Sequence, residues 1–94
     1  MHCRRHEYKG KVVFALCDKD LIGKKLEEGS IVLDLDKYRN FYIGDDLESF
    51  DGTFESINAV GEKSTTFLIE KGIAAKKDLK YIAGVPILQV YKIK

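Results

Sequence analysis

A cysteine and an aspartate stand together at the end of an unbroken apolar run, and they are the first residues whose types could do chemistry. Cys17 could act as a nucleophile, and Asp18 could act as a general acid or base. A reactive thiolate needs a base or a helix start beside it, and the short turn expected after Asp18 provides little of either. The alternative is that Cys17 is a small buried filler and that Asp18 caps the turn.

Two glycine-containing segments could complete a pocket beside this pair. Residues 61–65, Gly-Glu-Lys-Ser-Thr, lie where backbone N–H groups at a helix start can hold an anion. A P-loop requires a glycine, four residues and then Gly-Lys-Ser/Thr, whereas Glu62 here separates Gly61 from Lys63, so the spacing argues against nucleotide hydrolysis. An ordinary glycine entry into a helix is the alternative. The expected pocket or anion site consists of Cys17, Asp18, Gly61, Lys63, Ser64, Gly84 and Pro86.

Histidines, cysteines and acidic residues suggest metal sites, but their spacing does not support one. Zinc could be bound by His2, Cys3, His6 and Cys17, yet no Cys-x-x-Cys pair anchors such a site. Acidic residues at positions 34, 36, 45, 46, 48 and 51 could collect around Mg²⁺, but nothing fixes their distance from one another. A solvated strand face followed by an acidic loop is the simpler interpretation, so we predict no metal site, no catalytic residues and no cofactor.

Basic residues form groups along the chain that indicate a different kind of function. If the first and last strands are neighbours, two groups and exposed Tyr8 and Tyr91 would form a surface that follows phosphates and stacks bases. The residues predicted to contact nucleic acid are Arg4, Arg5, Lys76, Lys77 and Lys80. Further basic residues are Lys9, Lys11, Lys24, Lys25, Lys92 and Lys94. Scattered surface lysines are the alternative, because the net charge is only +1.

These residues depend on a few predicted elements in the first half of the chain. The apolar run of residues 12–16 predicts a central strand buried on both faces. Residues 2–8, joined to it by Lys9-Gly10, predict the first arm of a hairpin. Residues 30–36 predict a half-buried strand, and residues 37–52 predict an irregular stretch with one helical turn around residues 46–50.

The second half of the chain predicts one clear helix. Residues 62–71 are acidic at the start and basic at the end and are followed by Gly72, with residues 67–69 expected to be buried. Residues 53–60 favour a strand, a helical turn is expected near Lys76, and residues 85–93 predict a final strand. The fold class is therefore α+β: a single domain over residues 1–94 with about five mostly antiparallel strands and one main helix (about 62–71) packed on the sheet.

Length and composition restrict the class of protein. A chain of 94 residues supports one hydrophobic core. Two cysteines cannot make a disulfide framework, no signal-like segment is present, and apolar runs are far shorter than the ~20 residues that cross a bilayer. We therefore expect a cytoplasmic protein without a membrane partner.

The motifs together resemble the archaeal family called domain of unknown function 424. The resemblance rests on the Cys-Asp-x-x-Leu-x-Gly segment from Cys17, the helix start at Gly61, and Ala-Gly-Val-Pro ending at Pro86. In the family pattern a histidine commonly follows that proline. Ile87 stands here instead, so no role of such a histidine carries over. The resemblance implies a stand-alone archaeal cytoplasmic protein with an α+β fold and no established activity, with a link to translation by association only.

Three hypotheses about function follow. We favour a non-enzymatic binding module for RNA or a ribonucleoprotein that uses the basic residues. The first alternative is a small enzyme or ligand-binding domain with its pocket near Cys17 and Asp18. The second is a homo-oligomeric protein-interaction adaptor that uses the aromatic residues between positions 38 and 50.

Overall fold

The first two strands form the predicted hairpin. The computed structural model describes residues 1–92, in which β1 (His2–Tyr8) pairs antiparallel with β2 (Lys11–Cys17). Lys9 and Gly10 between them both have positive φ, 52° and 78°, as the tight turns that suit strand twist require. Phe14 and Leu16 are buried on one face of β2 and Ala15 and Cys17 on the other, which confirms a strand covered on both faces.

A five-stranded sheet is built around β2. Its order is β1-β2-β5-β7-β6, with β5 at Ser56–Val60, β6 at Lys80–Ile82 and β7 at Val85–Tyr91. Only the β2–β5 pair is parallel, so the prediction of an α+β fold with mostly antiparallel strands is confirmed. The long final strand β7 does not neighbour β1, however, because β2 and β5 lie between them. Residue 93, the predicted end of this strand, lies outside the described residues, as does Lys94.

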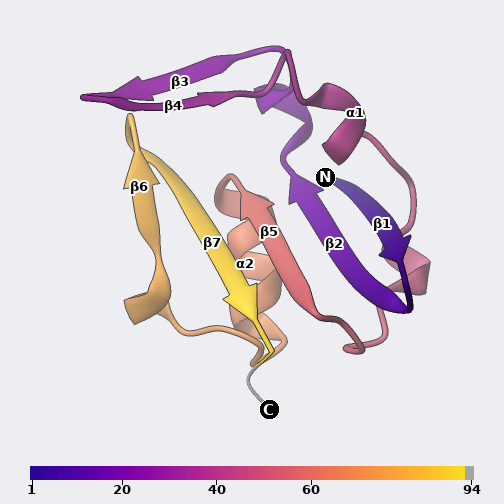
Figure 1. Cartoon of the computed structure of the whole chain (residues 1–94). Coiled ribbons are helices and arrows are strands. Elements are labelled where there is room, and N and C mark those ends of the chain that lie inside the picture. The colour runs from indigo at the N-terminus through magenta and orange to yellow at the C-terminus, as the bar shows by residue number, and fades with distance from the viewer. Residues whose placement is uncertain (93–94) are drawn as a thin grey trace.

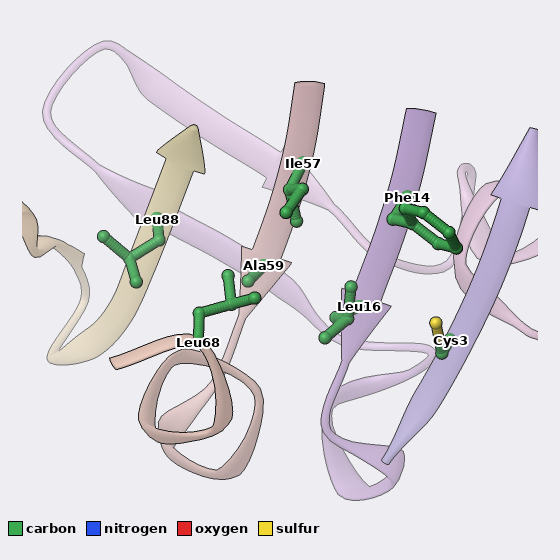
Figure 2. Close-up of a cluster of buried hydrophobic side chains, with 7 residues drawn as sticks. All are labelled: Cys3, Phe14, Leu16, Ile57, Ala59, Leu68 and Leu88. Carbon is green, nitrogen blue, oxygen red and sulfur yellow. The ribbon is translucent and has the colours of Figure 1, made fainter. Parts of the chain in front are cut away.

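The main helix covers one face of this sheet. Helix α2 (Glu62–Glu70) lies behind β5 and β7 in Figure 1. Figure 2 shows Leu68 of α2 beside Ala59, in a buried cluster with side chains from four strands: Cys3, Phe14, Leu16, Ile57, Ala59 and Leu88. Leu68 is buried as predicted, but Phe67 and Ile69 are only half-buried, and Ser64 and Thr65 are buried instead. Residues three and four positions apart share a helix face, so Ser64 and Thr65 lie with Leu68 against the sheet.

The opposite face, which we call the front face, is covered only in part. The hairpin of β3 (Lys25–Glu28) and β4 (Ile31–Asp34) crosses one end of it, and helix α1 (Arg39–Tyr42) packs over β1 and β2. Leu26 of β3, Leu35 after β4 and Tyr42 of α1 are buried in one cluster with Ala15, Cys17 and Val60 of the sheet. In Figure 1 no described helix or strand crosses the front of β5 and β7 beyond that hairpin.

Short segments complete the chain, and some differ from the prediction. The helical turns expected near residues 46–50 and near Lys76 are present as η2 (Leu47–Ser49) and η3 (Lys76–Asp78), and η1 (Lys19–Leu21) follows β2. Strand β4 ends at Asp34, two residues earlier than predicted. The Asp34 carboxylate accepts hydrogen bonds from the backbone N–H groups of residues 36 and 37, which turns the chain toward α1.

The outer edge of β1 is partly occupied by the segment that follows α1. The Cys3 N–H donates to the Gly44 carbonyl (3.3 Å), and the Asp46 N–H donates to the Cys3 carbonyl (2.7 Å). The Asp46 carboxylate accepts from the Arg5 N–H at 2.8 Å. Gly44 has to be glycine here, because a Cβ would lie 2.9 Å from the Arg4 Cβ. Backbone groups on the first half of β1 are therefore satisfied within the chain.

Candidate functional site

Asp18 lies where β2 meets the start of α2, and its side chain caps that helix. One carboxylate oxygen accepts hydrogen bonds from the Ser64 N–H and hydroxyl, both at 2.8 Å, and the other accepts from the Lys63 N–H at 3.0 Å. The prediction that Asp18 caps the turn after β2 is wrong, since its side chain makes no capping bond to η1. Its carboxylate instead satisfies donors 45 and 46 residues later in the chain.

Gly61 is required by this close approach. Its φ of +108° favours glycine, and a Cβ at this position would lie 2.3 Å from the Asp18 Cγ. The helix start that we expected to hold an anion therefore already holds a carboxylate of the chain. A further anion at the same N–H groups would meet the negative charge of Asp18.

A depression of about 480 Å³ adjoins this cap. It gathers five of the seven residues predicted to form a pocket: Asp18, Gly61, Lys63, Gly84 and Pro86. The other two, Cys17 and Ser64, are buried and do not line it. The rim carries both signs of charge, with Lys19 and Lys63 beside Asp20 and Glu62. Ligand binding in this depression stays a prediction.

Both cysteines are free and buried, and their surroundings raise the pKa of each thiol. Burial, with a smaller effect from the nearby Asp18 carboxylate, raises the pKa of Cys17 to about 12. Burial and the Asp46 carboxylate raise the pKa of Cys3 to about 11. Because the thiolate is the nucleophile, Cys17 in this environment is a core residue and lacks the features of a reactive cysteine.

The side chains considered for metal binding are separated or used locally. His2 and Cys3 are adjacent in β1 and point to opposite faces of the sheet. The His6 ring stacks on Phe41 with 4.5 Å between ring centroids, and its Nε2 lies 2.8 Å from the Phe41 carbonyl. Asp36 pairs with Arg39. Residues 1–92 contain no group of three or more His, Cys, Asp or Glu side chains arranged to hold a metal ion.

The five basic residues predicted to contact nucleic acid divide between the two edges of the sheet. Arg4 and Arg5 lie on β1, whereas Lys76, Lys77 and Lys80 lie on η3 and β6. Four strand spacings, about 19 Å, separate the edges. Arg5 faces the α2 side and pairs with Glu7 at 3.3 Å, while Arg4 on the front face donates to the Ile43 carbonyl at 3.4 Å. The condition for the predicted surface, that the first and last strands are neighbours, is not met, because β2 and β5 lie between β1 and β7. Contact of the five residues with nucleic acid stays a prediction.

Sequence reasoning missed the polar row on the front face between those edges. The register places Val13 beside Ser56, Ser56 opposite Tyr91, and Asn58 opposite Gln89. Polar residues alternate with apolar ones in both strands, Ser56 and Asn58 with Ile57 and Ala59, and Gln89 and Tyr91 with Leu88 and Val90. This period of two was the available signal, and it marks strands with one buried and one solvated face.

The aromatic stretch between positions 38 and 50 is mostly used in packing. Phe41 stacks on His6, Tyr42 is buried, and Phe50 contacts the rings of Phe14 and Phe67 edge-on. Tyr38 is the exposed aromatic residue of this stretch. The adaptor hypothesis loses most of the surface on which it was based, and the oligomeric state stays a prediction.

The architecture defines a small α+β domain with a mixed five-stranded sheet and one covering helix. The chain belongs to the family described as protein of unknown function (DUF424), which matches residues 6–93. The structure is similar to the crystal structure of an uncharacterized conserved protein from Methanopyrus kandleri, with a TM-score of 0.80 and 27% sequence identity. The similarity covers 96% of this chain and 89% of that one. The family resemblance and the fold class are thus confirmed.

No curated protein matches the sequence. In residues 1–92 no helix is both long enough and apolar enough to span a membrane.

Proposed function

We propose that this protein is a non-enzymatic cytoplasmic module that binds RNA, free or within a ribonucleoprotein. The observation that supports the proposal is the charge of the front face. The five-stranded sheet places three cationic residues there, Arg4, Lys11 and Lys80, and none of its acidic residues. The β3–β4 hairpin that crosses one end of the face carries acidic residues of its own. Because the whole chain has a net charge of only +1, the segregation of charge matters more than its sum.

A groove at one edge adds a place for a phosphate. Lys77 and Lys80 line a groove of about 550 Å³ together with Gln89 and Tyr91 of β7. Asp78 also borders this groove, but its carboxylate accepts a hydrogen bond from the Ala75 N–H at 3.0 Å. We propose that Lys77 and Lys80, with Lys76 beside them, contact phosphates at this edge. Arg4 supplies a cation at the β1 edge of the front face, which an RNA strand crossing the sheet would reach, whereas Arg5 lies on the α2 side of the same edge.

The test is the salt dependence of RNA binding. Fluorescence anisotropy of a labelled RNA should show that the affinity falls steeply between about 50 and 200 mM salt. The logarithm of the binding constant should fall by about 0.7 per log unit of salt concentration for each single-strand phosphate that the protein neutralises. The double variant Lys77→Gln/Lys80→Gln should reduce that slope by about 1.4. The matched control is Lys24→Gln/Lys25→Gln on the β3 side, which removes the same charge and should keep the slope. Absence of RNA binding and of heparin retention at low salt would refute the proposal.

A further inference from the structure

We infer that the RNA is single-stranded and that the rings of Tyr91 and Tyr8 stack its bases on the front face, an inference that rests on the proposed function. The two rings are at the surface, with 66% of Tyr91 and 73% of Tyr8 exposed. The register places both on the same side of the sheet. Tyr91 is opposite Ser56, Ser56 is beside Val13, and Val13 is opposite His6, two residues before Tyr8.

The spacing of the two rings suits a short single strand. Three strand spacings, about 14 Å, separate β1 from β7. RNA-binding sheets of similar width stack two or three bases on aromatic side chains. A duplex keeps its bases stacked inside, so it would contact these rings only through its backbone. In the sheet order β2 and β5 lie between the strands that carry the rings, and in Figure 1 no described helix or strand crosses the front of β5 beyond the β3–β4 hairpin.

The surface next to Tyr91, on the side toward the β3–β4 hairpin, is suited to base edges. Asn58 and Gln89 lie opposite each other in the centre of the sheet, where apolar or β-branched residues are usual. Each amide carries two donors and one acceptor oxygen, which matches the hydrogen-bonding edges of unpaired bases. Gln89 is exposed and Asn58 half-buried, so both side chains border the uncovered surface.

Cations lie at both ends of the path between the rings. Tyr91 shares its groove with Lys77 and Lys80. The Lys9 ammonium lies 5.4 Å from the centroid of the Tyr8 ring, which leaves the other side of that ring for a base. With a net charge of only +1, attraction of phosphates alone gives weak binding, so stacking has to supply a large share of the affinity.

The experiment compares tyrosine variants on a labelled single-stranded RNA and on its duplex. Tyr91→Ala and Tyr8→Ala should each weaken single-strand binding on the order of tenfold, with the salt slope unchanged, and Tyr91→Phe should bind like the wild type. The control is Tyr81→Ala. Tyr81 is exposed on β6 but pairs with Pro86 of the α2 side, so its loss should leave affinity unchanged. Because all three tyrosines are at the surface, unchanged circular dichroism is expected for every variant.

The outcomes separate this inference from the proposed function. Single-strand binding that is unaffected by Tyr91→Ala and Tyr8→Ala, or a duplex that binds as tightly as the single strand, would overturn the inference. If Lys77→Gln/Lys80→Gln still weakened binding in that case, the proposed function would stand. Failure to bind either nucleic acid would overturn both.

Discussion

Replacing Asp18 with alanine is expected to lower the free energy of unfolding by about 3 kcal/mol. Asp18 is 6% exposed, and its carboxylate accepts three hydrogen bonds, two from backbone N–H groups at the start of α2 and one from the Ser64 hydroxyl. Loss of a helix cap costs about 1–2 kcal/mol, and leaving the buried Ser64 donors unsatisfied adds about 1–3 kcal/mol. For a chain of 94 residues this corresponds to a decrease in Tm of about 15 °C.

The assay is urea unfolding followed by circular dichroism, with a matched control two residues away. Asp20→Ala removes an exposed carboxylate from the rim of the same depression and should change stability by no more than about 0.5 kcal/mol. Asp18→Asn keeps one acceptor oxygen and should fall between the two. Hydrogen exchange gives a local measurement, because the Lys63 and Ser64 amides should lose protection in Asp18→Ala. Equal stabilities of Asp18→Ala and Asp20→Ala would refute the assignment of Asp18 as the cap of α2.

Three further predictions concern the same end of the molecule. Gly61→Ala should lower the free energy of unfolding by more than about 3 kcal/mol, because the new Cβ would overlap Asp18. The control Gly52→Ala has positive φ but open space around it and should cost only about 1 kcal/mol, so similar losses for the two variants in urea titrations would contradict the prediction. Burial raises the pKa of Tyr42 from 10.0 to about 12 and the pKa of Cys17 from 9.0 to about 12. The neutral forms of both groups are therefore favoured by folding, and the stability that they contribute is complete below pH 9 and is lost as pH rises from 9 toward 12. Urea titrations at increasing pH should show that decline, with a smaller slope in Cys17→Ala, and a flat profile would argue against it. Alkylation of Cys17 at neutral pH should occur only at the rate of unfolding, and rapid modification of the native protein would show that the thiol is accessible.

Local patterns predicted the elements whose residues interact with near neighbours in sequence. The apolar run in β2 and the turn at Lys9-Gly10 define a hairpin because every pairing they make is local. The charge order and the flanking glycines likewise marked α2. Helix α1 was not predicted, since its four residues, Arg39–Tyr42, are fewer than any periodicity requires. Strand β6 was missed for the same reason, with three residues.

The candidate site was harder to predict because its contacts join distant segments. Most residues that line the depression could be predicted, because the segments containing Gly61 and Gly84 were expected to lie beside the end of β2, and they do. The role of Asp18 did not follow, because a carboxylate can cap the turn beside it or a helix 45 residues away, and only the packing of α2 decides between them. The separation of Arg4 from Lys77 likewise depends on strand order, which spacing along the chain does not encode.

The segment along β1 affects how copies of this protein can associate. Edge-to-edge growth of a sheet requires a free strand at both sides, so that each added molecule presents a new template for the next. Within residues 1–92 the five-stranded sheet has Asp45 bridged to Cys3 on one side, and β6 pairs only with Val85–Ile87 on the other. Two molecules that joined through the β6 side would expose only the second half of β1 at each end, so we expect such an association to end as a pair.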